Sequence, residues 1–259
     1  MSYYDTAYGA SGMDAAMRRE IYGRDIGQQS WLTAEQQERF ARLAGLTRAT
    51  RLLEVGCGAG GPALFLAQSI GLSVVGVDDN RAAIAAATAA ARDRRLAVRF
   101  VRADAGARLP FEDASFDAVE CIDAINHLPD RAAVLADWRR LLAPGGVVLY
   151  TDPVVVTGAV AAEEFALRSS IGRFVFLPPG ENERMLSDAG FEIVTVENLT
   201  EDEARISARR IEARDRRRAA LIAAEGEAAF AATQRFLAAV HALSASRRLS
   251  RFLYLGRRR

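Results

Sequence analysis

The sequence predicts an α/β fold built on a doubly wound, mostly parallel sheet of seven strands. Short apolar runs alternate with helical segments at the spacing of βαβ units. A glycine-rich turn, Gly56-x-Gly58-x-x-Gly61, directly follows the first apolar run. Glycine suits a strand-to-helix turn because it accepts positive φ and lets a ligand approach the backbone closely. At 259 residues and 50% hydrophobic, the chain is long enough to bury a full core.

The elements are expected in a regular order along the chain. Apolar runs predict seven strands, at 51–56, 73–78, 97–101, 116–122, 147–151, 191–196 and 251–255. Helical patterns lie between them, beginning at Gly61-Pro62 and covering 81–94, 131–142 and 181–189. The run Pro144-Gly145-Gly146 is expected to break the chain before the fifth strand. Further helices are expected at 11–43 and at 201–244, the latter broken near Gly226.

Composition excludes several classes of chemistry. The formal net charge is +1, and all 34 basic residues are arginine. Without lysine there is no Schiff-base lysine, no Tyr-x-x-x-Lys dehydrogenase dyad and no P-loop lysine. Neither a nucleic-acid nor a membrane partner is expected. The arginines of 205–218 are interleaved with Glu212 and Asp215 and follow Glu203, which favours a solvated helix surface over a nucleic-acid interface.

The cysteines and histidines are few. Cys57 and Cys121 do not form a disulfide framework, which favours a reduced, cytoplasmic protein. The first ten residues lack a signal-peptide pattern, and no run is long and apolar enough to span a membrane. With only His127 and His241, no metal site is expected.

Acidic residues lie at or just beyond the ends of the first three strands in succession. Glu54 lies two positions before Gly56, where a carboxylate would repel a pyrophosphate but suits a ligand carrying an ammonium or sulfonium. Asp78, followed by Asp79, ends the second strand and could accept both hydroxyls of a ribose. Asp104 closes the third strand, where it could accept a hydrogen bond from an adenine amino group. One such acid alone is more often a helix cap, but three in order indicate a site.

These motifs resemble those of the class I S-adenosylmethionine-dependent methyltransferases. The resemblance covers about 51–152, including Phe116-Asp117-Ala118-Val119 and the run Leu141-Leu142-Ala143-Pro144-Gly145-Gly146. It implies a seven-stranded sheet whose last strand is antiparallel, under a helical lid. It also implies S-adenosyl-L-methionine as cofactor and S-adenosyl-L-homocysteine as product. The cofactor-binding residues would be Glu54, Gly56, Cys57, Gly58, Gly60, Asp78, Asp79, Asp104, Ala105 and Asp123.

The segment after the fourth strand loosely resembles the phosphoethanolamine methyltransferases. It reads Asp123-Ala124-Ile125-Asn126-His127, and the family's pattern Asp-Ala-x-x-His implies a catalytic histidine. An ordinary histidine pKa of about 6.5 suits a general base. Asp123 would orient the ring, and Tyr8 stands near the place of the family's lid tyrosine. The alternative is that His127 only forms a wall of the cofactor pocket.

The flanking segments supply candidates for substrate binding. These are Gln28, Gln29, Trp31 and His127, with Arg168 and Arg173 after the fifth strand. Trp31 could equally pack in the core, and the glutamines could only close the pocket. An arginine facing the cavity would indicate an anionic substrate, whereas a solvated arginine would carry no such meaning.

The sequence therefore predicts methyl transfer to an oxygen or nitrogen of a small molecule, in natural-product or secondary metabolism. Two alternatives stay open: a cofactor-binding protein that catalyses another reaction, such as a cyclisation, and a non-catalytic binding module. Amphipathic C-terminal helices would allow a homodimer. Four regions are expected: a helical cap at 1–50, the cofactor-binding core at 51–156, a lid insertion at 157–180, and the rest of the sheet at 181–259 with a helical insertion at 201–246.

Overall fold

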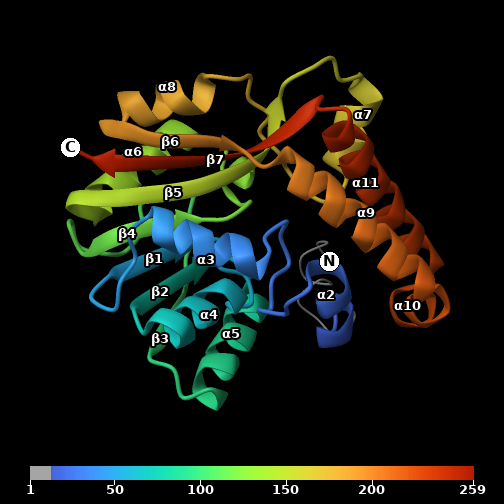
Figure 1. Cartoon of the computed structure of the whole chain (residues 1–259), viewed down its shortest axis with the longest axis horizontal. Coiled ribbons are helices and arrows are strands. Elements are labelled where there is room, and N and C mark those ends of the chain that lie inside the picture. Colours follow the sequence, from blue (N-terminus) through green and yellow to red (C-terminus); the bar gives the residue numbers. More distant parts are fainter. Residues whose placement is uncertain (1–12) are drawn as a thin grey trace.

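The computed structural model describes residues 13–259 and has a seven-stranded sheet at its centre (Figure 1). The strand order is β3-β2-β1-β4-β5-β7-β6. Five strands pair in parallel from β3 to β5, and β7 lies antiparallel between β5 and β6. The strands are β1 (Arg51–Val55), β2 (Ser73–Asp78), β3 (Val98–Arg102), β4 (Phe116–Cys121), β5 (Leu142–Val156), β6 (Phe191–Asn198) and β7 (Leu249–Arg258). The predicted sheet, including its antiparallel last strand, is confirmed.

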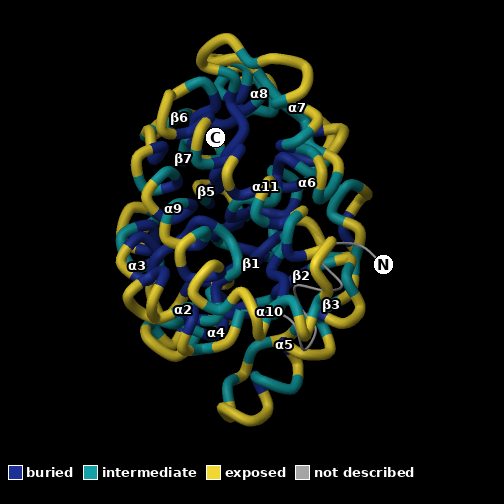
Figure 2. Tube along the Cα trace, turned by 90° about the vertical axis from the view of Figure 1, so that its right-hand side faces the viewer, coloured by how far each residue is buried: buried dark blue, intermediate teal, exposed yellow. Residues whose placement is uncertain are grey.

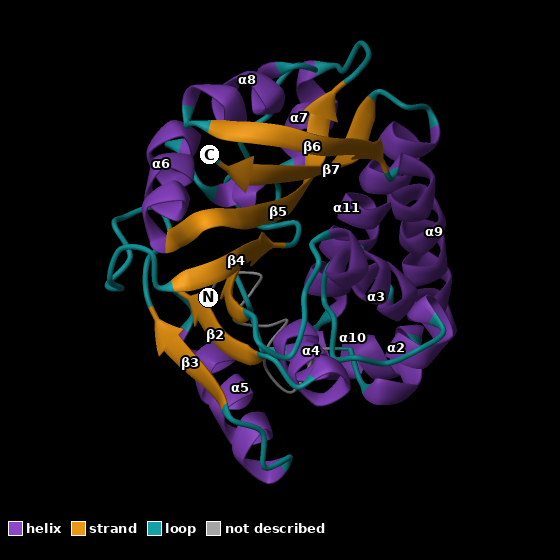
Figure 3. Ribbon diagram, turned by 60° about the vertical axis from the view of Figure 1, so that its left-hand side comes forward, coloured by secondary structure: helices purple, strands orange, loops and turns teal. Residues whose placement is uncertain are grey.

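Helices cover both faces of the sheet (Figures 1 and 3). On one face Trp138 of α6 and Leu186 of α8 pack on the sheet. On the other face Phe40 of α3 and Leu66 of α4 do the same. The helices are α2 (Ala15–Tyr22), α3 (Ala34–Leu43), α4 (Gly61–Ile70), α5 (Arg81–Asp93), α6 (Arg131–Leu141), α7 (Ala162–Arg168), α8 (Glu181–Asp188), α9 (Thr200–Arg216), α10 (Arg218–Glu225) and α11 (Glu227–Ala245).

The cap has a hydrophobic core of its own. Helices α9 and α11 run side by side, with α10 at their far end (Figure 1). Ile21 of α2 packs there against Ile206 of α9 and Leu237 of α11, and Trp31 joins the same cluster. In Figure 2 the buried positions gather around the sheet, while exposed positions follow the outer loops and helices. The N-terminal and C-terminal helices therefore form one lid, although more than 150 residues separate them in sequence.

Two local expectations need correction. The fifth strand was expected to begin after Pro144-Gly145-Gly146, but β5 begins at Leu142, because Leu142 already pairs with Phe116 of β4 and a register shift follows. The 201–244 helix breaks at Arg217 as well as at Gly226, whose φ is +87°.

Helix α9 also differs from the expected solvated surface. Its inner side buries Glu203, Arg210 and Arg214 together with apolar residues. Arg214 forms a buried ion pair with Glu225. Charged residues of this helix therefore belong partly to the interior, because helix α11 covers that face.

Tyr8 lies outside the described residues. Within the described part of the chain, every helix is too short or too polar to cross a lipid bilayer.

Candidate active site

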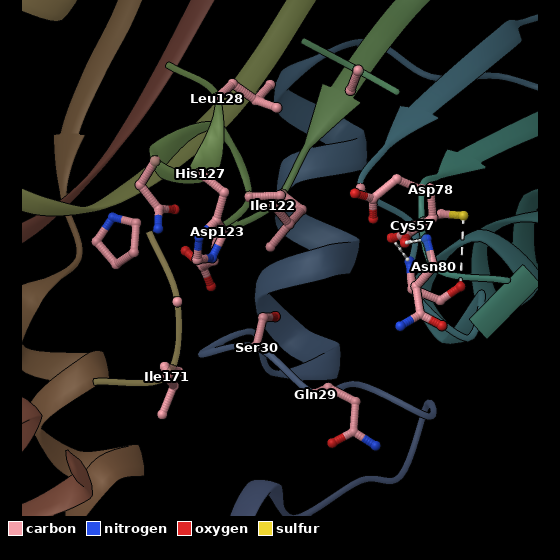
Figure 4. Close-up of a pocket in the computed structure, with 18 of the residues that line it drawn as sticks. Gln29, Ser30, Cys57, Asp78, Asn80, Ile122, Asp123, His127, Leu128 and Ile171 are labelled. Carbon is pink, nitrogen blue, oxygen red and sulfur yellow. Dashed lines mark hydrogen bonds between the residues drawn. The ribbon is translucent and has the colours of Figure 1, made fainter. Parts of the chain in front are cut away.

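A cavity of about 510 Å³ opens at the carboxyl ends of β1, β2, β3 and β4. Its opposite wall is formed by residues of segment 27–31, α7, the segment after α7, α9 and α11. In Figure 4, Cys57, Asp78 and Asn80 lie on one side of this cavity, and His127, Asp123 and Ile171 lie on the other. The carboxyl edge of a doubly wound sheet is where such folds bind ligands.

The glycine turn forms the floor of the cavity on the cofactor side. Gly56, Gly58 and Gly60 have φ values of +72°, +52° and +77°, a region that other residues rarely adopt. The Gly56 amide donates a 2.9 Å hydrogen bond to the Val77 carbonyl, which attaches the turn to the end of β2. A Cβ atom on Gly56 would lie 2.5 Å from that of Ala124. The turn therefore requires glycine at Gly56 for both conformation and space.

Asp78 supports the turn and faces the cavity. Its Oδ2 atom accepts a hydrogen bond from the Gly58 amide at 2.9 Å, and its Oδ1 atom accepts one from the Asn80 amide at 2.9 Å. Burial raises the pKa of Asp78, while these two backbone donors act in the opposite direction. The exposed Asp79 also lines the cavity. Asp78 is thus held with its carboxylate at the place expected for a ribose acid.

Glu54 is the buried acid of the site. It is 3% exposed, and within the described residues its Oε2 atom accepts no hydrogen bond. Burial raises the pKa of Glu54 well above its ordinary value, and the neighbouring Glu120 and Asp78 carboxylates raise it further. The Ala63 amide at the start of α4 acts in the opposite direction. A buried carboxylate oxygen without a donor is a site that a cationic ligand would satisfy.

Glu120 lies beside Glu54 in the sheet, because the two residues are register partners of β4 and β1. Both of its carboxylate oxygens accept from the Gln37 amide, at 3.1 and 3.0 Å. Burial raises the pKa of Glu120 to about 7, and the Gln37 donor lowers it. Glu120 does not line the cavity, so it acts on the site through Glu54.

The remaining cofactor-side candidates also line the cavity. Asp104 is exposed, accepts a 2.8 Å hydrogen bond from the Gly106 amide, and lines the cavity beside Ala105. Cys57 also lines the cavity, and burial raises the pKa of its thiol, so the thiol is protonated at neutral pH.

These residues fit S-adenosylmethionine. The cofactor carries a sulfonium and an ammonium, which the orphaned Oε2 atom of Glu54 would attract. Asp78 offers a carboxylate for ribose hydroxyls and Asp104 one for adenine. The glycine backbone leaves the turn open to close contact.

His127 lies at the end of a short 3-10 helix, η1 (Ile125–His127), that follows β4. Its Nδ1 atom lies 2.7 Å from the carbonyl oxygen of Arg173, and its ring lies 4.5 Å from that of Phe174. Because a carbonyl only accepts, the neutral ring carries its proton on Nδ1 and keeps Nε2 as the basic nitrogen. Burial lowers the pKa of His127, with the Arg173 carbonyl opposing that shift. The ring is therefore neutral at physiological pH.

Asp123 occupies a different role from the one expected. The sequence assigns it to orient His127, but the orienting partner at Nδ1 is the Arg173 carbonyl. Asp123 instead forms a buried ion pair with Arg251 at 2.8 Å and accepts hydrogen bonds from the Thr151 hydroxyl at 2.7 Å and the Trp31 amide at 3.0 Å. Its φ of +53° is unusual for a residue other than glycine. Asp123 thereby joins the sheet to the lid, and it lines the cavity.

Of the substrate-binding candidates in the N-terminal segment, two line the cavity and one supports the loop beside it. Gln29 and Trp31 line the cavity. Gln28 does not: it is buried, accepts from the Ile26 amide at 2.8 Å and donates to the Arg24 carbonyl at 3.0 Å. Gln28 therefore shapes the loop over the glycine turn.

Both arginine candidates line the cavity, in different ways. Arg168 of α7 is 2% exposed and lies 3.8 Å from the carboxylate of Glu203. Arg173 is exposed, and its backbone carbonyl is the partner of His127.

Sequence reasoning missed two cavity residues on the C-terminal helices, Arg210 of α9 and Phe236 of α11. The signal for Arg210 was present. Glu203, Ile206, Arg210 and Ala213 recur at helical spacing on one face of α9, and a buried face is what that period indicates. Phe236 lies on a helix with apolar residues on several sides and offered no comparable signal.

Comparison with known proteins identifies the family. Residues 53–150 match the model of the family described as "Methyltransferase domain". The 27-O-demethylrifamycin SV methyltransferase of Amycolatopsis mediterranei is 31% identical over 195 residues, which are 70% of this chain and 72% of that protein. A phosphoethanolamine N-methyltransferase of Triticum aestivum is also 31% identical over 70% of this chain, but the match spans only 36% of the wheat protein.

Among solved structures, phosphoethanolamine N-methyltransferase 2 of Haemonchus contortus has the same fold, with a TM-score of 0.84 at 24% identity. The match covers 98% of this chain and 58% of that one, which was solved with phosphomonomethylethanolamine and S-adenosylhomocysteine.

The fold and the cavity define a class I methyltransferase domain. The chain belongs to the S-adenosylmethionine-dependent methyltransferase family, as its motifs predicted. The cofactor of this family is S-adenosyl-L-methionine.

Proposed function

We propose that this protein transfers the methyl group of S-adenosylmethionine to an oxygen or nitrogen of a small molecule. The observation that carries the proposal is the continuity of one cavity, which joins the glycine turn and its acids to His127 and the lid. The relative from Amycolatopsis mediterranei is named for 27-O-demethylrifamycin SV, which supports a hydroxyl acceptor from secondary metabolism.

The cofactor, when bound, supplies an electrophilic methyl group on a sulfonium. Methyl transfer is an in-line displacement, so the protein mainly has to position the two reactants and exclude water. Glu54 would hold the cationic end, and Asp78 and Asp104 the adenosine. Trp31 and Ile171 would close the cavity from the lid side.

His127 is the proposed general base. A neutral ring with its proton on Nδ1 can take a proton at Nε2 from a hydroxyl or a protonated amine. The Arg173 carbonyl would stabilise the protonated ring by continuing to accept from Nδ1. Because this carbonyl belongs to the lid segment, ring orientation and lid position are linked.

A screen of acceptors tests the proposal. The protein is incubated with S-adenosylmethionine and a panel of phenols, amines, carboxylates and polyketide-like molecules, and mass spectrometry follows S-adenosylhomocysteine and methylated product together. We expect both products in equal amounts. Conversion of an acceptor without S-adenosylhomocysteine would favour the cyclisation-type alternative. Failure to bind the cofactor in calorimetry would favour a non-catalytic module.

Two further parts of the proposal concern the setting of the protein. Both cysteines are buried and free, which is compatible with a reducing cytoplasm. A homodimer stays a prediction, to be measured by light scattering.

A further inference from the structure

Asn126 is a cavity residue whose side chain has no hydrogen-bond partner. It lies in the short helix η1, lines the cavity and is 0% exposed. Within residues 13–259, neither its Oδ1 atom nor its Nδ2 atom takes part in a hydrogen bond. Buried polar groups are almost always hydrogen-bonded, because an unmade bond leaves the full cost of removing the group from water. An orphaned donor and an orphaned acceptor at a cavity wall therefore indicate a polar group of a ligand.

The main chain around Asn126 is held on two sides. Its carbonyl oxygen accepts a 2.8 Å hydrogen bond from the Val175 amide of the lid segment, and the His127 amide donates to the Ala124 carbonyl at 3.0 Å. The orphaned side chain is therefore not the product of a loosely held loop. Glu54, whose Oε2 atom is also orphaned, lies in β1 on the cofactor side, whereas Asn126 follows β4 beside His127. This position favours the acceptor over the cofactor as the partner of Asn126.

The carboxamide of Asn126 selects among polar groups by its two different atoms. Oδ1 only accepts and Nδ2 only donates, so a full match needs a donor and an acceptor side by side. A carboxylate or phosphate would leave Oδ1 orphaned, and an ammonium would leave Nδ2 orphaned. Two adjacent hydroxyl groups fit, because one can donate to Oδ1 while the other accepts from Nδ2. A primary amide offers the same pair but no hydroxyl oxygen for methylation.

Apolar and aromatic side chains line the same cavity. Trp31, Ile122 and Phe174 are among its lining residues. The rings of Phe174 and His127 lie 4.5 Å apart. Flat apolar surfaces of this kind favour a ligand with an aromatic body, and a few polar groups fix its orientation.

We propose that Asn126 determines acceptor specificity, and that the acceptor carries two adjacent hydroxyl groups on an aromatic body. One hydroxyl donates to Oδ1, and the oxygen of the other accepts from Nδ2. The second hydroxyl gives its proton to His127 while its oxygen forms the new bond to the methyl carbon. The bond between that carbon and the sulfonium breaks, and S-adenosylhomocysteine leaves as a neutral thioether. The inference rests on the proposed methyl transfer and adds the chemical class of the acceptor.

Isomeric probes test the inference on the full chain loaded with S-adenosylhomocysteine. The probes are 2,3-dihydroxynaphthalene and 2,7-dihydroxynaphthalene, which differ only in the spacing of their hydroxyl groups, and 2-naphthamide. Calorimetry measures the three affinities. We expect the 2,3-isomer to bind at least about tenfold more tightly than the 2,7-isomer and the amide, because it alone satisfies both orphaned atoms and presents a nucleophile.

Substitution of Asn126 locates the contact. Asn126→Leu has a similar shape without polar atoms and should abolish the preference for the 2,3-isomer while S-adenosylhomocysteine affinity stays the same. Asn126→Ala repeats this binding test with a smaller side chain. The thermal midpoint of Asn126→Leu should stay the same or rise, because an orphaned buried amide is replaced by an apolar group.

Asn182→Leu is the matched comparison for stability. Asn182 is also 0% exposed, but its amide donates to Asp152 at 3.0 Å and the residue does not line the cavity. Its replacement should lower the thermal midpoint. A fall of the same size in Asn126→Leu would show that Asn126 is structural and would overturn the inference.

The binding results can overturn the inference in further ways. Equal affinity for the two isomers, binding of none of the probes, or tighter binding of the amide would each do so. A preference that survives in both Asn126 variants, or a loss of their S-adenosylhomocysteine affinity, would do so too. Absence of S-adenosylhomocysteine binding in the wild-type protein would instead contradict the proposed function, so the two proposals fail in different ways.

Discussion

The two sides of the cavity are built by different means. The cofactor side uses one backbone turn and acids at the ends of neighbouring strands, with Glu54, Asp78 and Asp104 within about fifty residues of one another. The lid side gathers side chains from segment 27–31, α7, α9 and α11. The first side depends on local conformation, while the second depends on how distant helices pack. Substitutions should therefore affect cofactor affinity and acceptor chemistry separately.

The largest effect is expected at His127, which follows β4 and faces the lid across the cavity. His127→Ala should lower kcat by about 10²–10⁴-fold, the usual contribution of a general base, while S-adenosylhomocysteine affinity stays the same. Because burial lowers the pKa of His127, the acid limb of kcat/KM in the wild type should lie below pH 6.5.

His241→Ala is the control, since the Nδ1 atom of that ring donates to the Ala204 carbonyl of α9 and the residue does not line the cavity. Normal turnover by His127→Ala would contradict the proposal that His127 is the general base. It would not bear on the proposed cofactor-binding residues.

The ion pair between Asp123 and Arg251 joins the two sides, so breaking it should cost stability. Both side chains are buried, with exposures of 4% and 0%. Asp123→Asn leaves the arginine charge buried without its counterion and should lower the free energy of unfolding by about 3–5 kcal/mol. Asparagine tolerates the positive φ at this position, so the loss of stability would result from the missing carboxylate charge and not from backbone strain.

The matched control for that substitution is Glu38→Gln, which breaks the exposed pair with Arg24 and should cost less than about 1 kcal/mol in urea unfolding. Equal costs for the two substitutions would show that Asp123 does not act as a structural junction.

On the cofactor side, Glu120 should make stability depend on pH. Its folded pKa of about 7 exceeds the ordinary value of 4.5, so the folded state holds the proton more tightly than the unfolded state. Stability from this group is present below pH 4.5 and is lost as pH rises towards 7, by about 3 kcal/mol over the interval.

Glu120→Gln should remove this loss and become more stable relative to the wild type at pH 7.5 than at pH 5, as measured by urea unfolding. A stability difference that does not change with pH would contradict the raised pKa.

The smallest effect is expected in the glycine turn. There, the conformational cost of adding a Cβ atom can be separated from its steric cost. Gly56→Ala combines a positive φ with a Cβ contact of 2.5 Å, and should cost about 1–3 kcal/mol and weaken cofactor binding. Gly45→Ala has a φ of +65° but nothing within 4 Å of the added Cβ atom, so it isolates the conformational cost. We expect a smaller thermal shift for Gly45→Ala and unchanged cofactor affinity.

The contrast between the cofactor side and the lid side also explains which parts of the site could be predicted from the sequence. The order of strands and the residues of the cofactor turn follow from local signals, namely apolar runs, glycine at positive φ and acids after strands. Phe236 comes to the cavity through packing of α11 against α9, which no local pattern specifies, whereas Arg210 lies on a face of α9 that its helical period marks as buried. The role of Asp123 cannot be predicted from local sequence for a related reason, since its partner Arg251 lies 128 residues away.

The central claim is that cofactor binding belongs to the strand-end side and is independent of the lid arginines. Calorimetric titration of S-adenosylhomocysteine into the wild type, Asp78→Asn and Arg168→Gln tests it most directly. We predict one site in the wild type, binding weakened by about tenfold or more in Asp78→Asn through the lost charged acceptor, and unchanged affinity in Arg168→Gln. No binding by the wild type, or equal losses in the two variants, would contradict the claim.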